Sequence, residues 1–407
     1  MPIYRLENVV QPYEWGSRTA IADLLGQPSP APGPQAEMWM GTHPKGPSKV
    51  VAGDQKIPLQ QLIDRQSVGI LGRDVCMRYG NALPYLFKVL AAARPLSIQA
   101  HPSKRQAVEG FSRENREGKA VDAPDRNYRD DNHKPEIICA LTPFWGLNGF
   151  RPAAAAVDLL TPVCPTALNN AFQDLKRRQG KGLRNFFEAM MTLSAEKRKA
   201  AAREVLDKAG PVADASPLYQ WMVNLARAYP ADMGILSPAL LNLICLKPGQ
   251  AMFLPAGQLH AYLDGVGIEL MANSDNVLRG GLTPKHVDAS ELLSVVRFEE
   301  TSIKILEPFP MGSAESVYDC PAEEFSLTVI RPSNGQPYHS PSIRNVEMLL
   351  CTAGEGHIEY NDRRERLTVK KGDSFLVPAG LHAYVIGGSL TVYKAAVPLL
   401  RPSSKAS

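Results

Sequence analysis

The sequence predicts a mainly β fold that is interrupted by an α-helical insert and that contains one β module in two copies. Three observations support this prediction: short apolar runs cut by Gly and Pro at both ends of the chain, a block rich in Ala, Leu, Lys, Arg and Glu between them, and an internal repeat. We therefore expect residues 1–150 and 236–300 to form a first β domain in two parts. Residues 151–235 are expected to form a helical domain, and residues 301–407 a second β domain.

Composition places the chain among ordinary globular proteins. It has 407 residues, with 45 Lys and Arg against 41 Asp and Glu, so the net charge is 45 − 41 = +4. At about 150 residues per domain, this length predicts two or three domains. The small net charge and the lack of a basic block exclude a nucleic-acid footprint and a polybasic membrane patch.

Cysteine usage and hydropathy indicate a cytoplasmic protein. The six Cys residues form no Cys-x-x-Cys pair, which excludes a zinc ribbon and a thioredoxin motif. Cys139 lies in an apolar run and is expected in the core of a reduced protein. The first residues lack the form of a signal peptide, and no apolar run approaches the roughly 18 residues of a membrane-spanning helix. We therefore expect neither nucleic-acid nor membrane partners.

The first part of the chain has the pattern of strands and loops. Its apolar runs at 83–90, 96–101 and 136–141 are short and end at Gly, Pro or polar residues. The helical insert differs, because strong helix formers dominate and apolar residues recur every three or four positions. Ser194 precedes one such run and is expected to be a helix N-cap. Strand-like runs return from about residue 240.

The internal repeat relates residues 247–262 to residues 370–384. In both copies a Gly, at Gly249 and Gly372, stands six residues before Pro-Ala-Gly, and His-Ala-Tyr follows with one residue fewer between in the second copy. The period of 372 − 249 = 123 residues is too long for a solenoid, so we expect a duplicated domain.

The first copy also resembles the second motif of the cupins, Gly-x5-Pro-x-Gly-x2-His-x3-Asn, with His260 as its His and Asp264 at the Asn position. Cupins are small jelly-roll β-barrels that hold a metal, so this resemblance implies two cupin-like modules, the second one degenerate. The first cupin motif supplies His-x-His and a Glu. Here Gln99 and His101 have that spacing and Glu136 lies downstream, with Gln in place of the first His.

Gln99, His101, Glu136 and His260 together form a candidate metal site. Two imidazoles, a carboxylate and an amide oxygen suit Zn²⁺, with Fe²⁺ and Mn²⁺ as alternatives. The absence of Cys favours a catalytic metal that remains open to water or substrate. A single His on a strand is more often a hydrogen-bonded core residue, and we favour that interpretation for His382 in the second copy.

Several cations lie near these ligands in the sequence. Lys88 interrupts an apolar run, where an unpaired Lys is costly. Lys134 is two residues from Glu136 and is expected on the same strand face. Arg279 precedes two glycines, which allow the backbone to approach a ligand closely, and Lys285 follows. These residue types suit phosphate recognition. The structural alternatives are that Lys88 extends to solvent and that Arg279 braces a turn.

Motifs along nearly the full chain resemble the type I mannose-6-phosphate isomerase (phosphomannose isomerase) family. The most specific are Ser-Ile-Gln-Ala-His-Pro at 97–102 and Asn-Val-Leu-Arg-Gly-Gly-Leu-Thr-Pro-Lys at 276–285. Further matching stretches are residues 13–17, 36–44, 84–90, 132–136, 144–150 and 267–286. The resemblance is weakest across the helical insert and the C-terminal module.

This resemblance implies an aldose–ketose isomerase that interconverts D-mannose 6-phosphate and D-fructose 6-phosphate through a cis-enediol. It implies one Zn²⁺ per chain, held by the four candidate ligands, and a small phosphosugar as the partner. The catalytic candidates are Arg279, Lys134, Glu269 and Tyr262, and the substrate-binding candidates are Ser97, Lys88, Lys285 and Asp275. Whether the flux runs to mannose catabolism or to GDP-mannose biosynthesis stays open.

For the reaction, we place Arg279 beside the enediol oxygens, because their developing negative charge needs a cation or a metal. Ser97 and Lys285 are assigned to the phosphate. The proton-transferring base stays open among Lys134, Glu269, Tyr262 and a zinc-bound water.

Two other functions match parts of this pattern. A cupin-type metal-dependent oxygenase needs Fe²⁺ and usually a His-rich site, so Gln99 and the nearby cations argue against it. A non-catalytic sugar-phosphate-binding protein is expected to lack Lys134 or Arg279, and both are present. We expect a monomer, with a homodimer as the alternative.

Overall fold

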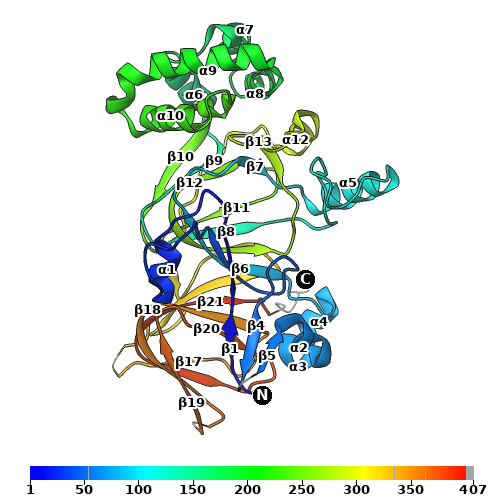
Figure 1. The fold of residues 1–407 in the computed structure, drawn as a ribbon, viewed down its shortest axis with the longest axis vertical. Helices are drawn as coiled ribbons and strands as arrows, with labels where there is room; N and C mark the ends of the chain where they lie inside the picture. The colour runs from blue at the N-terminus through cyan, green and yellow to red at the C-terminus, as the bar shows by residue number, and fades with distance from the viewer. Residues whose placement is uncertain (54, 334, 363, 400–407) are drawn as a thin grey trace, which may run out of the picture.

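Two large antiparallel sheets and one block of helices follow one another along the long axis of the molecule (Figure 1). This computed structural model describes residues 1–53, 55–333, 335–362 and 364–399. Helix and strand occur in equal amounts. The expectation of a mainly β chain is therefore corrected, because short helices lie where strands and loops were predicted.

The first sheet has ten strands and is organised around β12 (His260–Ala272). This long strand pairs with four others along its length, so it brings distant parts of the chain together. The other strands are β2 (Val9–Gln11), β3 (Glu37–Met40), β6 (Tyr85–Ala92), β7 (Ile98–Ala100), β8 (Glu136–Ala140), β9 (Phe144–Phe150), β10 (Leu241–Leu246), β11 (Ala251–Leu254) and β13 (Leu278–Gly281).

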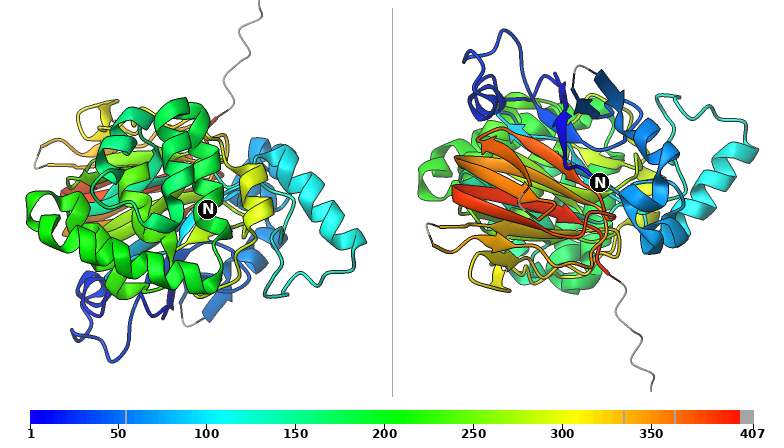
Figure 2. Two further views of the ribbon diagram at one scale, coloured as in Figure 1. Left: turned by 90° about the horizontal axis from the view of Figure 1, so that it is seen from above. Right: turned by 90° about the horizontal axis from the view of Figure 1, so that it is seen from below.

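The helical block covers one end of this sheet, as the green ribbon in Figure 1 and the view from above in Figure 2 show. Its helices are α6 (Ala153–Leu160), α7 (Asn169–Arg178), α8 (Leu183–Thr192), α9 (Ala195–Ala209), α10 (Pro217–Ala228) and α11 (Ser237–Leu240). Four 3-10 turns lie at Thr166–Leu168, Gln179–Gly182, Gly210–Ala215 and Met233–Leu236. Ser194 accepts a hydrogen bond from Lys197 N, which confirms the predicted N-cap of α9. Apolar helix residues share one core with Phe150 and Leu278 of the sheet.

The second sheet has eleven strands and contains the C-terminal part of the chain. Its C-terminal strands are β14 (Phe309–Pro310), β15 (Glu315–Val317), β16 (Ser326–Ile330), β17 (Tyr338–His339), β18 (Glu347–Tyr360), β19 (Glu365–Lys370), β20 (Ser374–Val377) and β21 (Tyr384–Ala396). Three N-terminal strands complete it, namely β1 (Tyr4–Glu7), β4 (Lys49–Ala52) and β5 (Gln55–Pro58).

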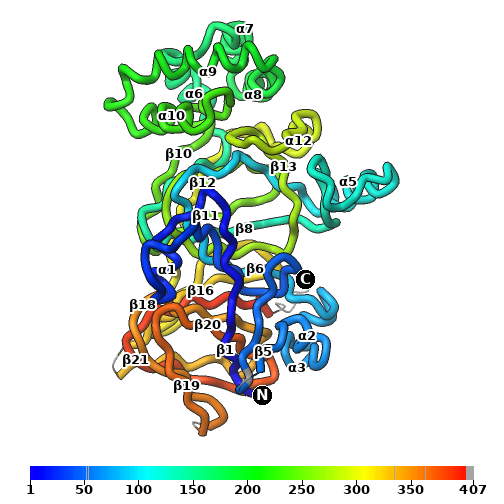
Figure 3. Tube along the Cα trace, in the orientation of Figure 1, coloured from blue at the N-terminus to red at the C-terminus, as the bar shows by residue number. Residues whose placement is uncertain are grey.

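The start of the chain therefore lies in the sheet of the C-terminal part. Tyr4 on β1 is directly opposite Leu376 on β20, and β4 pairs with the other edge of β1. Figure 3 shows this blue N-terminal trace beside the orange and red strands. The structure thus differs from the expectation that residues 1–150 form one part of the first β domain. The remaining domain limits stay a prediction.

Short helices account for the unexpected helix content. They are α1 (Ala20–Leu25), α2 (Leu59–Arg65), α3 (Ser67–Leu71), α4 (Arg73–Tyr79), α5 (Lys104–Arg116) and α12 (Ala289–Val295). Most of them are too short to show a helical period. For α5 a sequence signal existed, because Ser103 and Gln106 form a capping box at its start.

The two copies of the repeat form similar turns. Gly249 and Gly372 adopt positive φ angles of 87° and 90°, which favour glycine, and a short strand follows each of them. The copies differ afterwards. Strand β12 begins at His260, whereas β21 begins at Tyr384, so His382 lies in the preceding turn and is exposed.

Two further observations relate to composition. Cys139 is buried and free, as the sequence predicts for a core cysteine. Among the described residues, no helix combines the length and the apolar character that crossing a membrane requires.

Candidate metal centre and substrate pocket

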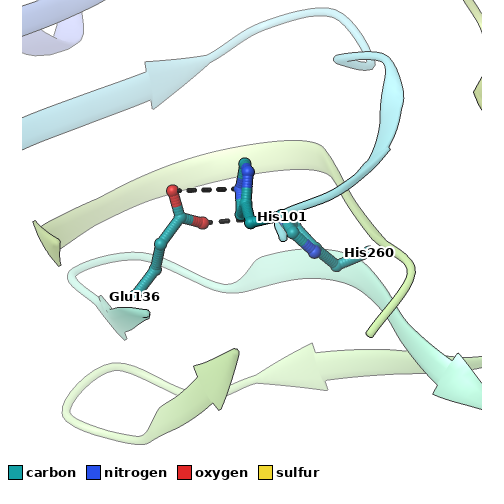
Figure 4. Close-up of side chains that lie close together, drawn as sticks. All are labelled: His101, Glu136 and His260. Carbon is teal, nitrogen blue, oxygen red and sulfur yellow. Dashed lines mark ion pairs between the residues drawn. The ribbon is translucent and has the colours of Figure 1, made fainter. Parts of the chain in front are cut away.

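Three of the four predicted metal ligands meet inside the first sheet (Figure 4). His101 follows β7, Glu136 opens β8 and His260 opens β12, so three separate segments supply them. Their candidate ligand atoms all lie within 4.8 Å of one another, and each residue is at most 2% exposed. Glu136 faces both imidazoles: its Oε1 is 3.4 Å from His101 Nε2, and its Oε2 is 3.4 Å from His260 Nε2.

Backbone carbonyls fix the tautomers of both imidazoles. His101 Nδ1 lies 2.7 Å from the carbonyl oxygen of Asn276. His260 Nδ1 lies 2.9 Å from that of Gln258. A carbonyl oxygen only accepts hydrogen bonds, so each Nδ1 donates and each Nε2 is directed towards Glu136.

This arrangement suits a divalent cation. A nitrogen lone pair that faces a carboxylate is repelled by it. Three buried atoms have no hydrogen-bond partner among the described residues, namely His101 Nε2, His260 Nε2 and Glu136 Oε2. A divalent metal between them would accept all three lone pairs. The residues present therefore fit a metal of the zinc type.

Burial and nearby charges keep His101 and Glu136 in the protonation states that bind metal. Burial, reinforced by Lys134, lowers the pKa of His101 to about 4, so this imidazole is neutral at pH 7. Burial alone would raise the pKa of Glu136, but Lys134 and His101 hold it well below its usual range. Metal binding requires neutral imidazoles and an ionised carboxylate.

Strand register places Gln99 and Arg279 beside this centre. Gln99 on β7 is directly opposite His260 on one side and Arg279 on the other. Directly opposed residues of antiparallel strands point to the same face, with Cβ atoms about 4.5–5.5 Å apart. The three side chains therefore form a row across the sheet, in which Gln99 lies between His260 and Arg279.

A second row contains buried charges. Lys88 on β6 is directly opposite Glu269 on β12 and Trp39 on β3. Lys88 Nζ lies 2.8 Å from Glu269 Oε2 and 3.7 Å from Glu37 Oε1. Burial would lower the pKa of Lys88, but Glu269 and Glu37 raise it above its usual value, so the ammonium stays charged. Lys88 is only 6% exposed and does not extend to solvent.

The base candidates have different environments. Lys134 Nζ lies 2.8 Å from Glu136 Oε1 and is bound in an ion pair. Burial raises the pKa of Tyr262 well above its usual value, so its hydroxyl stays protonated. Burial, assisted by Glu136, also raises the pKa of Glu269 in spite of the neighbouring Lys88. Glu269 is thus a carboxylate whose basicity is increased by its surroundings.

Cations lie together next to Arg279. Burial lowers the pKa of Arg279, and the nearby Arg129 lowers it further. Burial, Arg279, Arg129 and Lys45 lower the pKa of Lys285. Within the described part of the chain, Arg129, Arg279 and Lys285 form no ion pair. Ser97 is partly buried and immediately precedes β7.

Asp275 lies between β12 and β13 and is already engaged. Its Oδ1 lies 3.3 Å from His43 Nε2, and its Oδ2 lies 2.8 Å from Lys45 Nζ. Burial would raise the pKa of Asp275, but these two neighbours hold it below its usual range. A substrate contact of Asp275 would have to compete with both partners.

The second copy of the repeat has a different interior. Tyr384, the counterpart of Tyr262, donates to Glu347 Oε2 at 2.8 Å, and Arg344 Nε lies 3.1 Å from the same oxygen. Lys394 Nζ lies 3.5 Å from Glu347 Oε1. Protein cations therefore already balance this buried carboxylate. The metal-free state expected for the second module stays a prediction.

Several residues of the site were not found from the sequence. Asn276 and Gln258 hold the imidazoles through backbone carbonyls, which every residue type supplies, so no side-chain pattern could reveal them. Glu37, His43 and Arg129 have partners far away in the chain, and only the fold shows those partners.

The fold and the site define a class of protein, namely a metalloprotein of mixed sheet and helix. Its buried His/Glu/His centre adjoins cations that suit an anionic ligand and that form no ion pair among the described residues. Comparisons with known proteins narrow this class. A family model described as phosphomannose isomerase type I, catalytic domain, matches residues 3–153. The mannose-6-phosphate isomerase of Salmonella typhimurium strain LT2 is 41% identical, with 92% of this chain and 94% of the relative covered. The human mannose-6-phosphate isomerase is 34% identical, with 86% and 88% covered.

Solved structures agree with these relatives. A mutant phosphomannose isomerase from Salmonella typhimurium superimposes with a TM-score of 0.90 at 36% identity, covering 98% of this chain and all of that chain. A zinc-bound mannose 6-phosphate isomerase gives a TM-score of 0.89 at 36% identity, with the same coverage. The chain belongs to the mannose-6-phosphate isomerase family.

Proposed function

We propose that this chain is a zinc-dependent mannose-6-phosphate isomerase, which interconverts D-mannose 6-phosphate and D-fructose 6-phosphate. The proposal rests on the centre of His101, Glu136 and His260, whose unpartnered buried nitrogen and oxygen atoms could hold a metal ion. Membership of the family supplies the reaction, since curated relatives are named for it. Two solved relatives contain zinc.

One Zn²⁺ per chain would be held by Gln99, His101, Glu136 and His260. The bound metal supplies a Lewis acid for the carbonyl and hydroxyl oxygens of the sugar. The hydrogen bonds from His101 and His260 to backbone carbonyls support this role, because they orient both rings before metal binds.

Arg279 stabilises the negative charge that develops on the enediol oxygens. Its place in the row with Gln99 and His260 brings a permanent cation next to the metal ligands. Lys88 adds a second fixed charge on the neighbouring strands, where burial weakens screening by water. Ser97 and Lys285 contact the phosphate.

Glu269 transfers the proton between C1 and C2 of the sugar. Its raised pKa supports this role over Tyr262, which holds its proton too tightly, and over Lys134, which is paired with Glu136. Lys88 keeps Glu269 in place through its 2.8 Å ion pair. A solvent-exchange experiment on Glu269→Gln measures this role. We expect the variant to lose turnover and, with it, the uptake of tritium from water into the product.

At the level of the fold, we propose that the two sheets are jelly-roll modules of the cupin type and that the second one binds no metal. The long strands β12 and β21, each preceded by a similar turn, support this relation. A monomer in the cytoplasm is the expected working form, with a homodimer as the alternative.

A coupled assay of the zinc-loaded protein with mannose 6-phosphate tests the function directly. We expect turnover that a chelator removes and that added zinc restores. Binding of the sugar phosphate without turnover would favour a non-catalytic sugar-phosphate-binding protein. Bound iron together with oxygen consumption would favour an oxygenase.

Arg279→Ala tests the proposed charge stabilisation. We expect kcat to fall about 10²- to 10³-fold, the usual cost of removing one group that stabilises a developing oxyanion, with a smaller change in KM. Arg116→Ala is the matched control, because Arg116 is an exposed arginine on α5. An unchanged kcat would remove Arg279 from the mechanism.

A further inference from the structure

We propose that Arg129 is a further substrate-binding residue, which contacts the phosphate group and selects phosphorylated over unphosphorylated sugars. The inference rests on the proposed isomerase function and extends it to the loop that precedes β8. Three observations carry it: a rigidly held backbone, a connection to the metal centre, and a guanidinium without a protein partner.

Both neighbours of Arg129 are fixed. Tyr128 N donates to Glu114 Oε2 at 2.8 Å, and the buried Tyr128 ring donates through its hydroxyl to Glu291 Oε1 at 2.6 Å. On the other side, Asp130 Oδ2 accepts from Asp275 N at 2.7 Å. Because the backbone is held on both sides of it, Arg129 has little freedom beyond its own side chain.

Asn276 connects Arg129 to the metal centre. The Arg129 N–H donates to Asn276 Oδ1 at 2.7 Å, and Asn276 Nδ2 donates to the carbonyl oxygen of Asp130 at 2.8 Å. The carbonyl oxygen of the same asparagine accepts from His101 Nδ1 at 2.7 Å. Arg279 follows three residues later in the chain. The Arg129 loop, a metal ligand and Arg279 are therefore held at a fixed spacing.

The Arg129 side chain lacks the partners of a structural arginine. Arg126, three residues earlier, is buried and has its Nε 3.0 Å from Glu114 Oε2. The partly buried Arg129 guanidinium has no hydrogen-bond or ion-pair partner among the described residues. Its positive charge lies near Arg279 and Lys285, because, in addition to burial, it lowers the pKa of both. Three such cations are stable together when an anion joins them.

A phosphate monoester is the anion that fits this set. It carries up to two negative charges and several acceptor oxygens, which a planar guanidinium can bind through two parallel hydrogen bonds. The metal centre and the loop of Arg129 are connected through Asn276, and we expect one sugar phosphate to extend from one to the other. The sugar would lie on the metal side and the phosphate on the side of Arg129.

Calorimetry on the zinc-loaded protein tests this role without turnover by comparing fructose 6-phosphate, fructose and inorganic phosphate. We expect Arg129→Gln to weaken binding of fructose 6-phosphate and of inorganic phosphate by about 10- to 100-fold, the effect of losing a charge-assisted hydrogen bond. Fructose binding and zinc content should stay unchanged, because the backbone bond to Asn276 remains. Arg129→Lys should restore part of the affinity, and Arg116→Gln, which removes an exposed charge, should match the wild type.

The inference fails if Arg129→Gln binds inorganic phosphate and fructose 6-phosphate as tightly as the wild type. It also fails if fructose binding or zinc content falls in parallel, since that would indicate a structural role. Turnover of mannose 6-phosphate by the wild type is measured separately. If the wild type binds the phosphosugar through Arg129 but does not isomerise it, the proposed function is wrong. The inference about Arg129 would still hold in that case.

Discussion

His260 and His382 occupy matching places in the internal repeat but have different surroundings. His260 is fully buried, its Nδ1 is bound to a carbonyl, and its Nε2 faces Glu136. His382 is exposed in a turn. One residue fewer between Pro-Ala-Gly and His in the second copy explains the change, because the side chain no longer starts the long strand.

Substituting these two histidines tests the metal centre. We expect His260→Ala to lose bound zinc, since it removes one of the buried ligands, while His382→Ala keeps zinc and near-normal activity. Elemental analysis of the purified variants measures the metal, and circular dichroism checks that both remain folded. Loss of zinc in His382→Ala would show that the second copy contributes to the site.

The pKa of His101 predicts how the metal-free protein responds to acid. Burial lowers this pKa to about 4, whereas an unfolded His titrates near 6.5. Between these values the unfolded chain binds a proton that the folded chain does not, so stability falls as the pH decreases. From pH 7 to pH 5 the loss from this group is about 2 kcal/mol.

Denaturant titration of the metal-free protein at pH 7 and pH 5 measures this loss. Equal stability of the protein at both pH values would contradict the expected burial of a neutral His101.

At the residue scale, the sequence supported the candidates whose chemistry is visible in their side chains. The spacing of Gln99 and His101, the turn before His260 and the position of Glu136 were enough to suggest a shared site, and the structure brings three of these four together. The tautomers of His101 and His260 could not be predicted, because they depend on backbone carbonyl groups that carry no sequence signature. The partners of Lys88 were also beyond reach, since Glu269 lies 181 residues away.

At the element scale, one of the contacts between helix α5 and the loop of Arg129 depends on a glycine. Gly110 on α5 lies against the Tyr128 ring, and a Cβ at this position would overlap that ring. Glycine in a helix normally destabilises a protein relative to Ala, so Gly→Ala at most other helical positions would be expected to increase stability. Here the missing side chain is what allows the ring to be buried.

Gly110→Ala therefore should destabilise the protein, by about 1–3 kcal/mol, because the buried ring has to move. Gly210→Ala is the matched control: its Cβ would meet nothing within 4 Å and its φ is −53°, so we expect a small gain of about 0.5–1 kcal/mol. Thermal unfolding of both variants provides the comparison. A gain in stability for Gly110→Ala would show that Tyr128 adapts without cost.

The helical insert illustrates what element-scale prediction can do. Helix formers at regular spacing predicted a helix in this region, and the cap at Ser194 predicted where α9 begins. Helices of five to seven residues, such as α2, α3 and α4, show no complete period, and their place was decided by packing against the sheets.

At the scale of the whole molecule, the two sheets share one core cluster. Leu6 of β1, Phe87 of the first sheet and Met348 of the second belong to it. No local pattern predicts that β1 pairs with β20, because the partners are about 370 residues apart in the chain. The repeat suggested two modules, and the fold adds that they are joined through their strands and core.

Leu6→Ala therefore should weaken both sheets together. We expect a loss of about 2–4 kcal/mol, because a buried Leu leaves a cavity. Hydrogen exchange should accelerate in β20 and also in β6, which share the core with it. Ile305→Ala, at a position that is 43% exposed, is the control and should change neither strand. Faster exchange confined to β20 would show that the sheets open independently.

The position of β1 also constrains how this chain is made. Its partner β20 leaves the ribosome more than 300 residues after β5, which is about 15–60 s of synthesis at ordinary elongation rates. During that interval β1, β4 and β5 present an unpaired edge and unburied apolar side chains such as Leu6 and Val50. We therefore expect the N-terminal segment to gain its final packing only after the last strands of the described fold have been made.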